Sequence, residues 1–215
     1  MSTASLKHPK GLYVLFATEM WERFNYYGMR AILVLFLTKA LLFDKVFASQ
    51  VYGSYTGLVY LTPLLGGYIA DRYWGNNRSI IAGGLVMAIG EFILFGCGTF
   101  YQNADLSAIL FYSGLGCMIA GNGFFKPNIS TLLGGLYAAP QYQEQKDTGY
   151  NIFYMGINLG AFIAPFVASY LRNNYGWGYA FAAAGVGMLL GVIIFWLGNK
   201  HYKEADVKKP AASND

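Results

Sequence analysis

Six long apolar blocks dominate this sequence, and their length restricts the possible folds more than any other feature. The blocks cover residues 11 to 37, 50 to 71, 79 to 100, 106 to 127, 149 to 171 and 177 to 198. A helix of about 20 apolar residues is long enough to cross the hydrocarbon core of a bilayer. Only 12% of the residues are charged, whereas soluble domains carry about 25%. The sequence therefore predicts an integral membrane protein.

Helices fit these blocks better than strands do. The strands of membrane barrels are alternating segments of about ten residues, whereas these blocks are continuous and longer. Backbone polar groups inside lipid also need internal partners, which a helix provides. We predict an all-α membrane protein with six transmembrane helices in a bundle over residues 11–198. A cytoplasmic segment, residues 1–10, precedes this bundle, and a polar cytoplasmic tail or linker, residues 199–215, follows it.

Basic residues between the blocks predict the orientation in the membrane. Cytoplasmic loops are enriched in Lys and Arg, and six crossings place both chain ends on the same side. If both termini are inside, nine basic residues lie inside and three lie outside. The inside set is Lys7, Lys10, Arg72, Arg78, Lys146, Lys200, Lys203, Lys208 and Lys209, and the outside set is Lys39, Lys45 and Arg172. We therefore expect cytoplasmic termini, and we attribute the net charge to topology and not to nucleic-acid binding.

Small residues one helical turn apart predict close packing between helices. Such pairs occur in three of the blocks, as Gly53 with Gly57, Gly156 with Gly160, and Gly187 with Gly191.

Motifs for enzyme chemistry are missing from the sequence. It contains no GxSxG, HExxH or CxxC pattern, and both cysteines, Cys97 and Cys117, lie in apolar blocks. We expect no metal and no cofactor.

The first block carries a polar stripe. The residues are spaced i, i+3, i+4, i+7, i+8 and i+11, which places them on one helix face; they are Glu19, Glu22, Arg23, Tyr26, Tyr27 and Arg30. Each charge at the centre of a membrane helix costs about 2.5 to 3.5 kcal/mol. This face must therefore turn toward protein or water, and we expect it to line a watery chamber.

The charges of the stripe allow two interpretations. Two carboxylates beside one arginine titrate together, so protonation can change which ion pair forms and could drive a conformational change. Alternatively, Glu19, Glu22 and Arg23 form a buried cluster of ion pairs that only locks helices together.

Lys126 and Glu91 are further charged residues in apolar blocks. Pro127 follows Lys126, so we expect the helix to bend or break there. Lys126 either extends to the membrane interface or faces a cavity as a cation. Glu91 is a lone acid, for which a hydrogen-bonded structural position is one interpretation.

Four segments of the chain resemble the proton-dependent oligopeptide transporters of the major facilitator superfamily. They read ExxERFxYYG at residues 19–28, GGYIADRxxG at 66–75, GNGFFKPN at 121–128 and FYMGINLG at 153–160. The resemblance covers almost the whole chain, but the chain has only half of the usual length of the family. It implies the N-terminal six-helix bundle of a major facilitator fold, with a 3+3 repeat.

The resemblance also implies roles for individual residues. Glu19, Glu22 and Arg23 would form a cluster that couples transport to protons by exchanging ion-pair partners with Lys126. The residues expected to bind substrate are Tyr26, Tyr27, Arg30, Tyr60, Lys126, Tyr154 and Asn158. Gly67, Asp71, Arg72 and Arg78 would form a cytoplasmic gating loop, although its basic residues could reflect topology alone.

The function implied by this family is secondary transport and not enzyme catalysis. The chain would be the N-terminal half of a proton-coupled di/tripeptide symporter that works by alternating access. The expected partners are di/tripeptides, protons, the lipid bilayer and the missing C-terminal six-helix bundle, and the expected location is a bacterial inner membrane. Two alternatives remain open. The protein could transport nitrate, an amino acid or an organic acid, or the half-bundle could act only as an assembly module.

Overall fold

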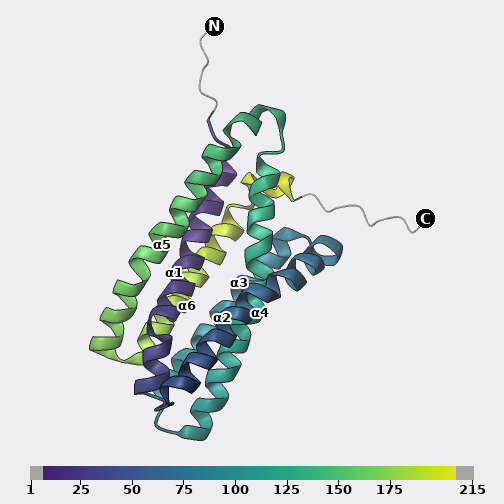
Figure 1. Cartoon of the computed structure of the whole chain (residues 1–215). Helices are drawn as coiled ribbons and strands as arrows, with labels where there is room; N and C mark the ends of the chain where they lie inside the picture. Colours follow the sequence, from purple (N-terminus) through teal and green to yellow (C-terminus); the bar gives the residue numbers. More distant parts are fainter. Residues whose placement is uncertain (1–6, 207–215) are drawn as a thin grey trace, which may run out of the picture.

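The computed structural model describes residues 7–206, and this range contains six long helices and no strand. The long helices are α1 (Lys10–Lys39), α2 (Lys45–Ile69), α3 (Asn76–Thr99), α4 (Ala104–Leu136), α5 (Lys146–Tyr175) and α6 (Trp177–Leu197) (Figure 1). A π-helical turn, Ala70–Trp74, joins α2 to α3. Short 3-10 turns cover Pro140–Gln145, Asn199–His201 and Lys203–Ala205. The prediction of an all-α protein is confirmed.

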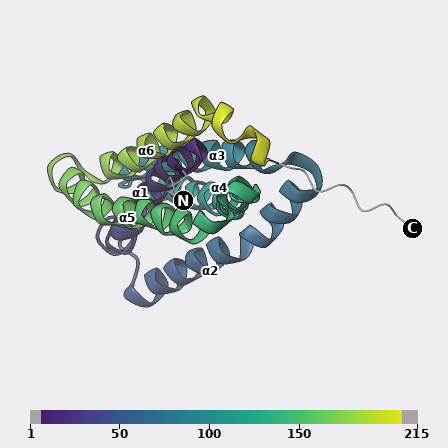
Figure 2. The same ribbon diagram turned by 90° about the horizontal axis from the view of Figure 1, so that it is seen from above.

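The helices form two layers of outer helices with α1 and α4 between them (Figure 2). On one side, α3 and α6 pack against each other, and they also pack along α4 and α1 respectively. On the other side, α5 packs along α1 and α2 packs along α4. The polar stripe on α1 therefore lies on a central helix of the bundle.

The hydropathy of four helical segments supports insertion into a membrane. Four segments of the described range are long and apolar enough to cross a membrane: Asn76–Thr99, Ala104–Leu136, Pro140–Tyr175 and Trp177–Leu197. Helices α1 and α2 do not meet the same criterion, since α1 carries the charged stripe and α2 contains several tyrosines. Six crossings therefore stay a prediction.

Two of the three predicted glycine pairs pack closely against α1. A Cβ atom added to Gly156 of α5 would lie 2.9 Å from the carbonyl oxygen of Phe16. The pair on α6 likewise lies against α1 side chains. In contrast, a Cβ atom on Gly53 or Gly57 of α2 would have no heavy atom of the described chain within 4 Å. That pair does not pack helices together within residues 7–206.

Helix α4 does not break near Lys126, because it continues through Pro127 to Leu136; a bend at this point stays a prediction. Proline lacks the amide that would bond to the carbonyl group four residues earlier, here that of Gly123. This carbonyl group faces α2 so closely that a Cβ atom on Gly66 would overlap its oxygen. Helix α4 is therefore continuous where it packs against α2. The prediction that this span ends at residue 127 is wrong.

The segment that follows α6 folds back onto the bundle. Tyr202 is only 1% exposed, its ring stacks on Phe195 with centroids 4.5 Å apart, and its hydroxyl donates to the Phe195 carbonyl oxygen at 2.5 Å. The predicted polar tail, residues 199–215, therefore begins as packed structure, because a buried aromatic ring anchors it. Residues 1–6 and 207–215, including Lys208 and Lys209 of the orientation set, lie outside the described residues.

Candidate functional site

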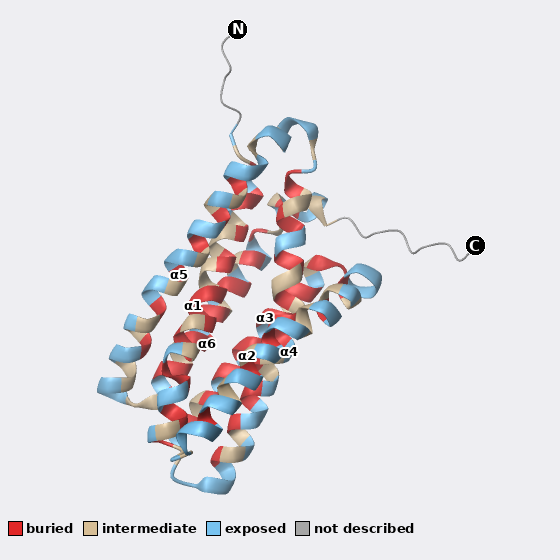
Figure 3. Cartoon of the chain, in the orientation of Figure 1, coloured by how far each residue is buried: buried red, intermediate tan, exposed pale blue. Residues whose placement is uncertain are grey.

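The charged part of the α1 stripe forms one compact ion cluster. The Nε atom of Arg23 lies 3.0 Å from Oε1 of Glu19, and it also contacts Oε2 of Glu22. The exposed fractions are 3% for Glu19, 0% for Glu22 and 5% for Arg23. Buried positions are concentrated where the central helices meet, as Figure 3 shows, and the outer faces of α2 and α5 are largely exposed. The predicted ion pairs are present, but the cluster is buried and does not line an open chamber.

Helix α4 contacts this cluster through Asn122. Its Nδ2 atom donates to Oε1 of Glu22 at 3.2 Å, and the Asn122 side chain is buried. Asn122 lies one turn before Lys126 on the same helix. The ion cluster and the Lys126 region therefore share a short stretch of α4.

Lys126 is half-buried, and no ion pair within residues 7–206 includes it. Its Nζ atom lies 4.7 Å from the ring centroid of Tyr60, which is a cation–π contact. Its positive charge acts electrostatically on both Glu19 and Glu22. The predicted partner exchange between the carboxylates and Lys126 would require a conformation different from this one.

Arg30 lies two turns beyond Arg23 on α1 and is half-buried. Its Nε atom donates to the hydroxyl group of Tyr52 on α2. The ring of Tyr26 lies between the two arginines, with its centroid 5.4 Å from Cζ of Arg23 and 5.9 Å from Cζ of Arg30. The stripe therefore changes from a buried cluster to a partly open cationic end.

The remaining residues expected to bind substrate lie on several helices. Tyr27 is half-buried and packs edge-on against Tyr26, with ring centroids 5.2 Å apart. Tyr60 on α2 is 61% exposed, Tyr154 on α5 is 58% exposed, and Asn158 is also exposed. Direct contact connects Tyr60 with Lys126, whereas Tyr154 and Asn158 occupy the free face of α5. The structure thus brings together only part of the predicted set.

The predicted gating residues do not form an open loop. Gly67 lies within α2, and Asp71 and Arg72 are exposed in the π-helical turn. The Nη1 atom of Arg72 donates to the hydroxyl group of Tyr68 at 3.0 Å. Arg78 is exposed in the first turn of α3. These residues form a helical corner at the end of α2, and a role in gating stays a prediction.

Sequence reasoning missed three polar residues that contact the stripe or its neighbours, namely Asn25, Tyr52 and Asn122. The i, i+4 spacing of Asn122 and Lys126 indicates that both lie on one face of the helix and could have identified Asn122. Asn25 points off the stripe and donates to Oε1 of Glu91 at 3.3 Å. Tyr52 had no signal, because its contact with Arg30 depends on how α2 packs.

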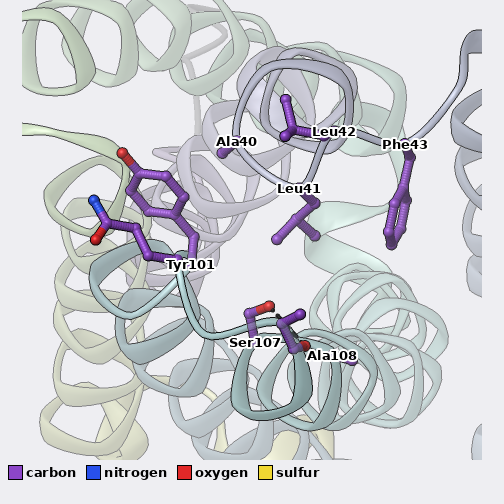
Figure 4. A pocket seen from close by; sticks show the side chains of 9 residues that line it. Ala40, Leu41, Leu42, Phe43, Tyr101, Ser107 and Ala108 are labelled. Carbon is purple, nitrogen blue, oxygen red and sulfur yellow. Dashed lines mark hydrogen bonds between the residues drawn. The ribbon is translucent and has the colours of Figure 1, made fainter.

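One cavity lies far from this cluster. It has a volume of about 390 Å³ and lies where the α1–α2 and α3–α4 connections meet. Figure 4 shows Leu41, Phe43 and Tyr101 around it. Its lining contains no charged residue, so it does not overlap the predicted site.

Buried ionisable residues on membrane helices are typical of transport proteins, where they form pathways and proton relays. Comparison with known proteins agrees with this class. A sequence profile described as "PTR2: POT family" matches residues 77–214 of this chain. The chain belongs to the POT family, and it is an integral membrane protein.

Two relatives illustrate the similarity in sequence. The chain is 42% identical over 198 residues to "Uncharacterized transporter YclF" of Bacillus subtilis (strain 168), which covers 90% of this chain and 38% of the relative. It is 38% identical over 204 residues to a "Di-/tripeptide transporter" of Lactococcus lactis subsp. lactis (strain IL1403), covering 91% and 39% respectively. The chain thus spans about two fifths of the length of these relatives.

Solved structures of POT family transporters also resemble the fold of this chain. The crystal structure of peptide transporter POT in complex with sulfate superposes with a TM-score of 0.85 at 36% identity, covering 96% of this chain and 41% of that one. A POT family transporter in complex with a thioalcohol conjugated peptide gives a TM-score of 0.83 at 34% identity, covering 94% and 41%. Another, in complex with 5-aminolevulinic acid, gives 0.84 at 34% identity, covering 96% and 42%.

Proposed function

We propose that this chain is the N-terminal half of a proton-coupled di/tripeptide symporter that works by alternating access. The observation that carries the proposal is the buried cluster of Glu19, Glu22 and Arg23, which contacts α4 one turn from Lys126. Membership of the POT family and the similarity to di-/tripeptide transporters support peptide as the substrate.

The proton is the natural coupling ion for this cluster. Two carboxylates share one guanidinium nitrogen, so the fully ionised cluster holds one excess negative charge away from water. Binding one proton removes that charge, and an approaching Lys126 would balance it equally well. The two events oppose each other, because both together would leave one excess positive charge, so a proton would control whether α1 and α4 are connected by an ion pair.

The cationic end of the stripe is suited to the carboxylate terminus of a peptide. Arg30 and Lys126 are both half-buried; Arg30 contacts the rings of Tyr26 and Tyr52, and Lys126 contacts the ring of Tyr60. Partly desolvated cations bind carboxylates more strongly than cations in water do. Tyr26, Tyr27, Tyr60, Tyr154 and Asn158 would contact the rest of the peptide.

Topology and assembly complete the proposal. Both termini are cytoplasmic, six helices cross a bacterial inner membrane, and the bundle contains a 3+3 repeat. The packing of α5 on α1 and of α2 on α4 supports this repeat, because it relates equivalent helices of the two groups. Because the chain spans about two fifths of its relatives, a C-terminal six-helix bundle would complete the site. The isolated chain then does not transport.

Uptake by the full-length protein in proteoliposomes tests the proposal. Labelled dialanine should accumulate when an inward proton gradient is imposed. Glu22→Gln should abolish gradient-driven accumulation but retain exchange of dialanine across the membrane, because only the proton site is lost. Lys126→Ala should reduce both activities.

Matched controls are available on the exposed 3-10 turn and the start of α5. Glu144→Gln and Lys146→Ala make the same chemical changes at exposed positions and should leave uptake unchanged. Gradient-driven accumulation that persists in both Glu22→Gln and Lys126→Ala contradicts the coupling role. Uptake by the purified 215-residue chain alone contradicts the half-transporter proposal.

A second substrate class has a specific observation in its favour. The similar POT family transporter in complex with 5-aminolevulinic acid holds a small amino acid. The same cations on this chain would bind its carboxylate. Competition by 5-aminolevulinic acid for dialanine uptake, compared with its own gradient-driven accumulation, separates this substrate from an inhibitor.

A further inference from the structure

Glu91 is a buried acid that the proposed transport mechanism does not use. It lies in the interior of α3, and its side chain is 0% exposed. The α1 ion cluster does not include it, since both ion pairs described in residues 7–206 join Arg23 to Glu19 or Glu22. A buried acid without a cation requires a separate explanation.

A single side chain holds the Glu91 carboxyl group. The Nδ2 atom of Asn25 donates to Oε1 of Glu91 at 3.3 Å and to the carbonyl oxygen of Ala184 at 3.1 Å. Asn25 is itself 0% exposed. This one amide therefore connects α1 with both α3 and α6.

The cations on the helices around Glu91 have other partners: Arg23 of α1 pairs with Glu19 and Glu22, Arg30 of α1 bonds to Tyr52, and Lys126 of α4 contacts the ring of Tyr60. Helix α6 presents backbone and Gly185, whose added Cβ atom would lie 3.1 Å from Cβ of Glu91. On α4, Cys117 packs beside the neighbouring Gly90, and on α2 the buried phenol of Tyr55 lies within electrostatic range. The only other charged residue of α3 is Arg78, in its exposed first turn.

Two oxygen atoms at this contact have no hydrogen-bond donor within the described chain. They are Oε2 of Glu91 and Oδ1 of Asn25, and both are buried. An ionised carboxylate would leave both oxygens as acceptors and would place an unbalanced charge in the bundle, which is strongly unfavourable. A protonated carboxyl group is neutral, and its O–H group supplies a donor beside these two unpaired acceptor oxygens.

We propose that Glu91 is a further proton-binding site, which keeps its proton at neutral pH and positions Asn25, and through it α1, against α3 and α6. A carboxylic acid and a carboxamide have complementary edges, so the proton allows the pair to bond in both directions. This proton does not take part in coupling. The inference is independent of which solute the protein transports.

Infrared difference spectroscopy of the full-length protein tests the proton directly. The spectrum of the wild type minus that of Glu91→Gln at about pH 7 should contain the carbonyl stretch of a protonated carboxylic acid, although exposed glutamates have pKa values of about 4.3. Glu144→Gln, at an exposed position, should not remove this band. A difference spectrum that shows loss of only carboxylate bands overturns the proposal.

Transport and stability supply a second readout. Glu91→Gln retains a donor and should keep gradient-driven uptake, whereas Glu91→Leu should lower the thermal unfolding midpoint. Loss of gradient-driven uptake in a folded Glu91→Gln protein would mean that this proton is exchanged during transport, which contradicts the proposal. Should Glu91→Gln not fold, Asn25→Ala keeps the test open. In Asn25→Ala, the carbonyl band of the Glu91 carboxylic acid should shift in frequency relative to the wild type. An unshifted band overturns the positioning role of Glu91.

Discussion

The carboxylate of Asp206 accepts two hydrogen bonds from Asn76, the first residue of α3. Its Oδ1 atom lies 3.0 Å from the backbone nitrogen of Asn76 and 3.1 Å from Nδ2. Oδ2 accepts from the backbone nitrogen of Asn77 at 3.2 Å. Asp206 thus supplies to α3 the N-terminal cap that its own preceding residue, Gly75, has no side chain to provide.

Asp206→Ala should therefore loosen the start of α3. Loss of an N-terminal cap costs about 0.5 to 2 kcal/mol, so the thermal unfolding midpoint of the full-length protein should fall and the amide hydrogens of Asn76 and Asn77 should exchange faster. Glu204→Ala removes an exposed acid from the same segment and serves as the control. Equal amide exchange in both variants would contradict the capping role of Asp206.

The contact of α2 with α4 depends on Gly66. A Cβ atom there would overlap the backbone of Gly123, which has no flexible side chain that could move away. We expect Gly66→Ala to force the helices apart and to destabilise the protein by about 1 to 3 kcal/mol or more, as overpacking does. Gly53→Ala on the same helix meets open space and should be neutral or stabilising by up to about 1 kcal/mol. Thermal unfolding in detergent compares the two, and equal midpoints would refute the close approach.

Tyr137 should make stability depend on alkaline pH. Burial, with smaller effects of Tyr13 and Tyr142, raises the pKa of Tyr137 to about 12, from an ordinary value of about 10. The folded state therefore favours the neutral phenol. This contribution is fully present below about pH 10 and is lost as the pH rises through about 12.

The phenol of Tyr137 also bonds to Nδ1 of His8 at 2.8 Å. Tyr137→Phe should reduce stability at neutral pH by about 0.5 to 1.5 kcal/mol and weaken the alkaline loss of stability. Unfolding midpoints measured as a function of pH provide the test, with Tyr73→Phe at an exposed position as control. A pH dependence unchanged by Tyr137→Phe would contradict this explanation.

Arg30 should act mainly on substrate binding. Arg30→Ala removes a charged hydrogen-bond donor, which costs about 1.5 to 3 kcal/mol. This loss corresponds to a rise of roughly tenfold to a hundredfold in the KM for dialanine. Lys39→Ala removes an exposed cation from the last turn of the same helix and should leave KM unchanged. Uptake kinetics at a fixed proton gradient measure both variants. A normal KM for Arg30→Ala would exclude Arg30 from the substrate site.

The long helices are predictable because uninterrupted apolar segments need internal hydrogen bonds in lipid. The end of α4 is not predictable from the sequence. Pro127 suggests that the helix stops there, whereas α4 packs against Gly66 of α2 and continues to Leu136. The segment after α6 is polar overall, and a single buried ring at Tyr202 is sufficient to fold it back. Local composition does not contain such long-range contacts.

The candidate site is likewise predictable from the sequence only in part. Spacing along one helix predicts that Glu19, Glu22 and Arg23 meet, and they do. The hydrogen bonds from Asn122 to Glu22 and from Asn25 to Glu91 join residues 100 and 66 positions apart. No pattern within one helix predicts them, because they depend on how the helices are rotated against each other.

The Tyr26 ring, which lies between Arg23 and Arg30, connects the two ends of the stripe mechanically. Each guanidinium group is attracted to the π electrons of this one ring, at 5.4 Å for Arg23 and 5.9 Å for Arg30 from the ring centre. A rigid ring cannot follow both cations when one of them moves. We therefore expect that a solute that displaces Arg30 would also alter the surroundings of Arg23, two helical turns away.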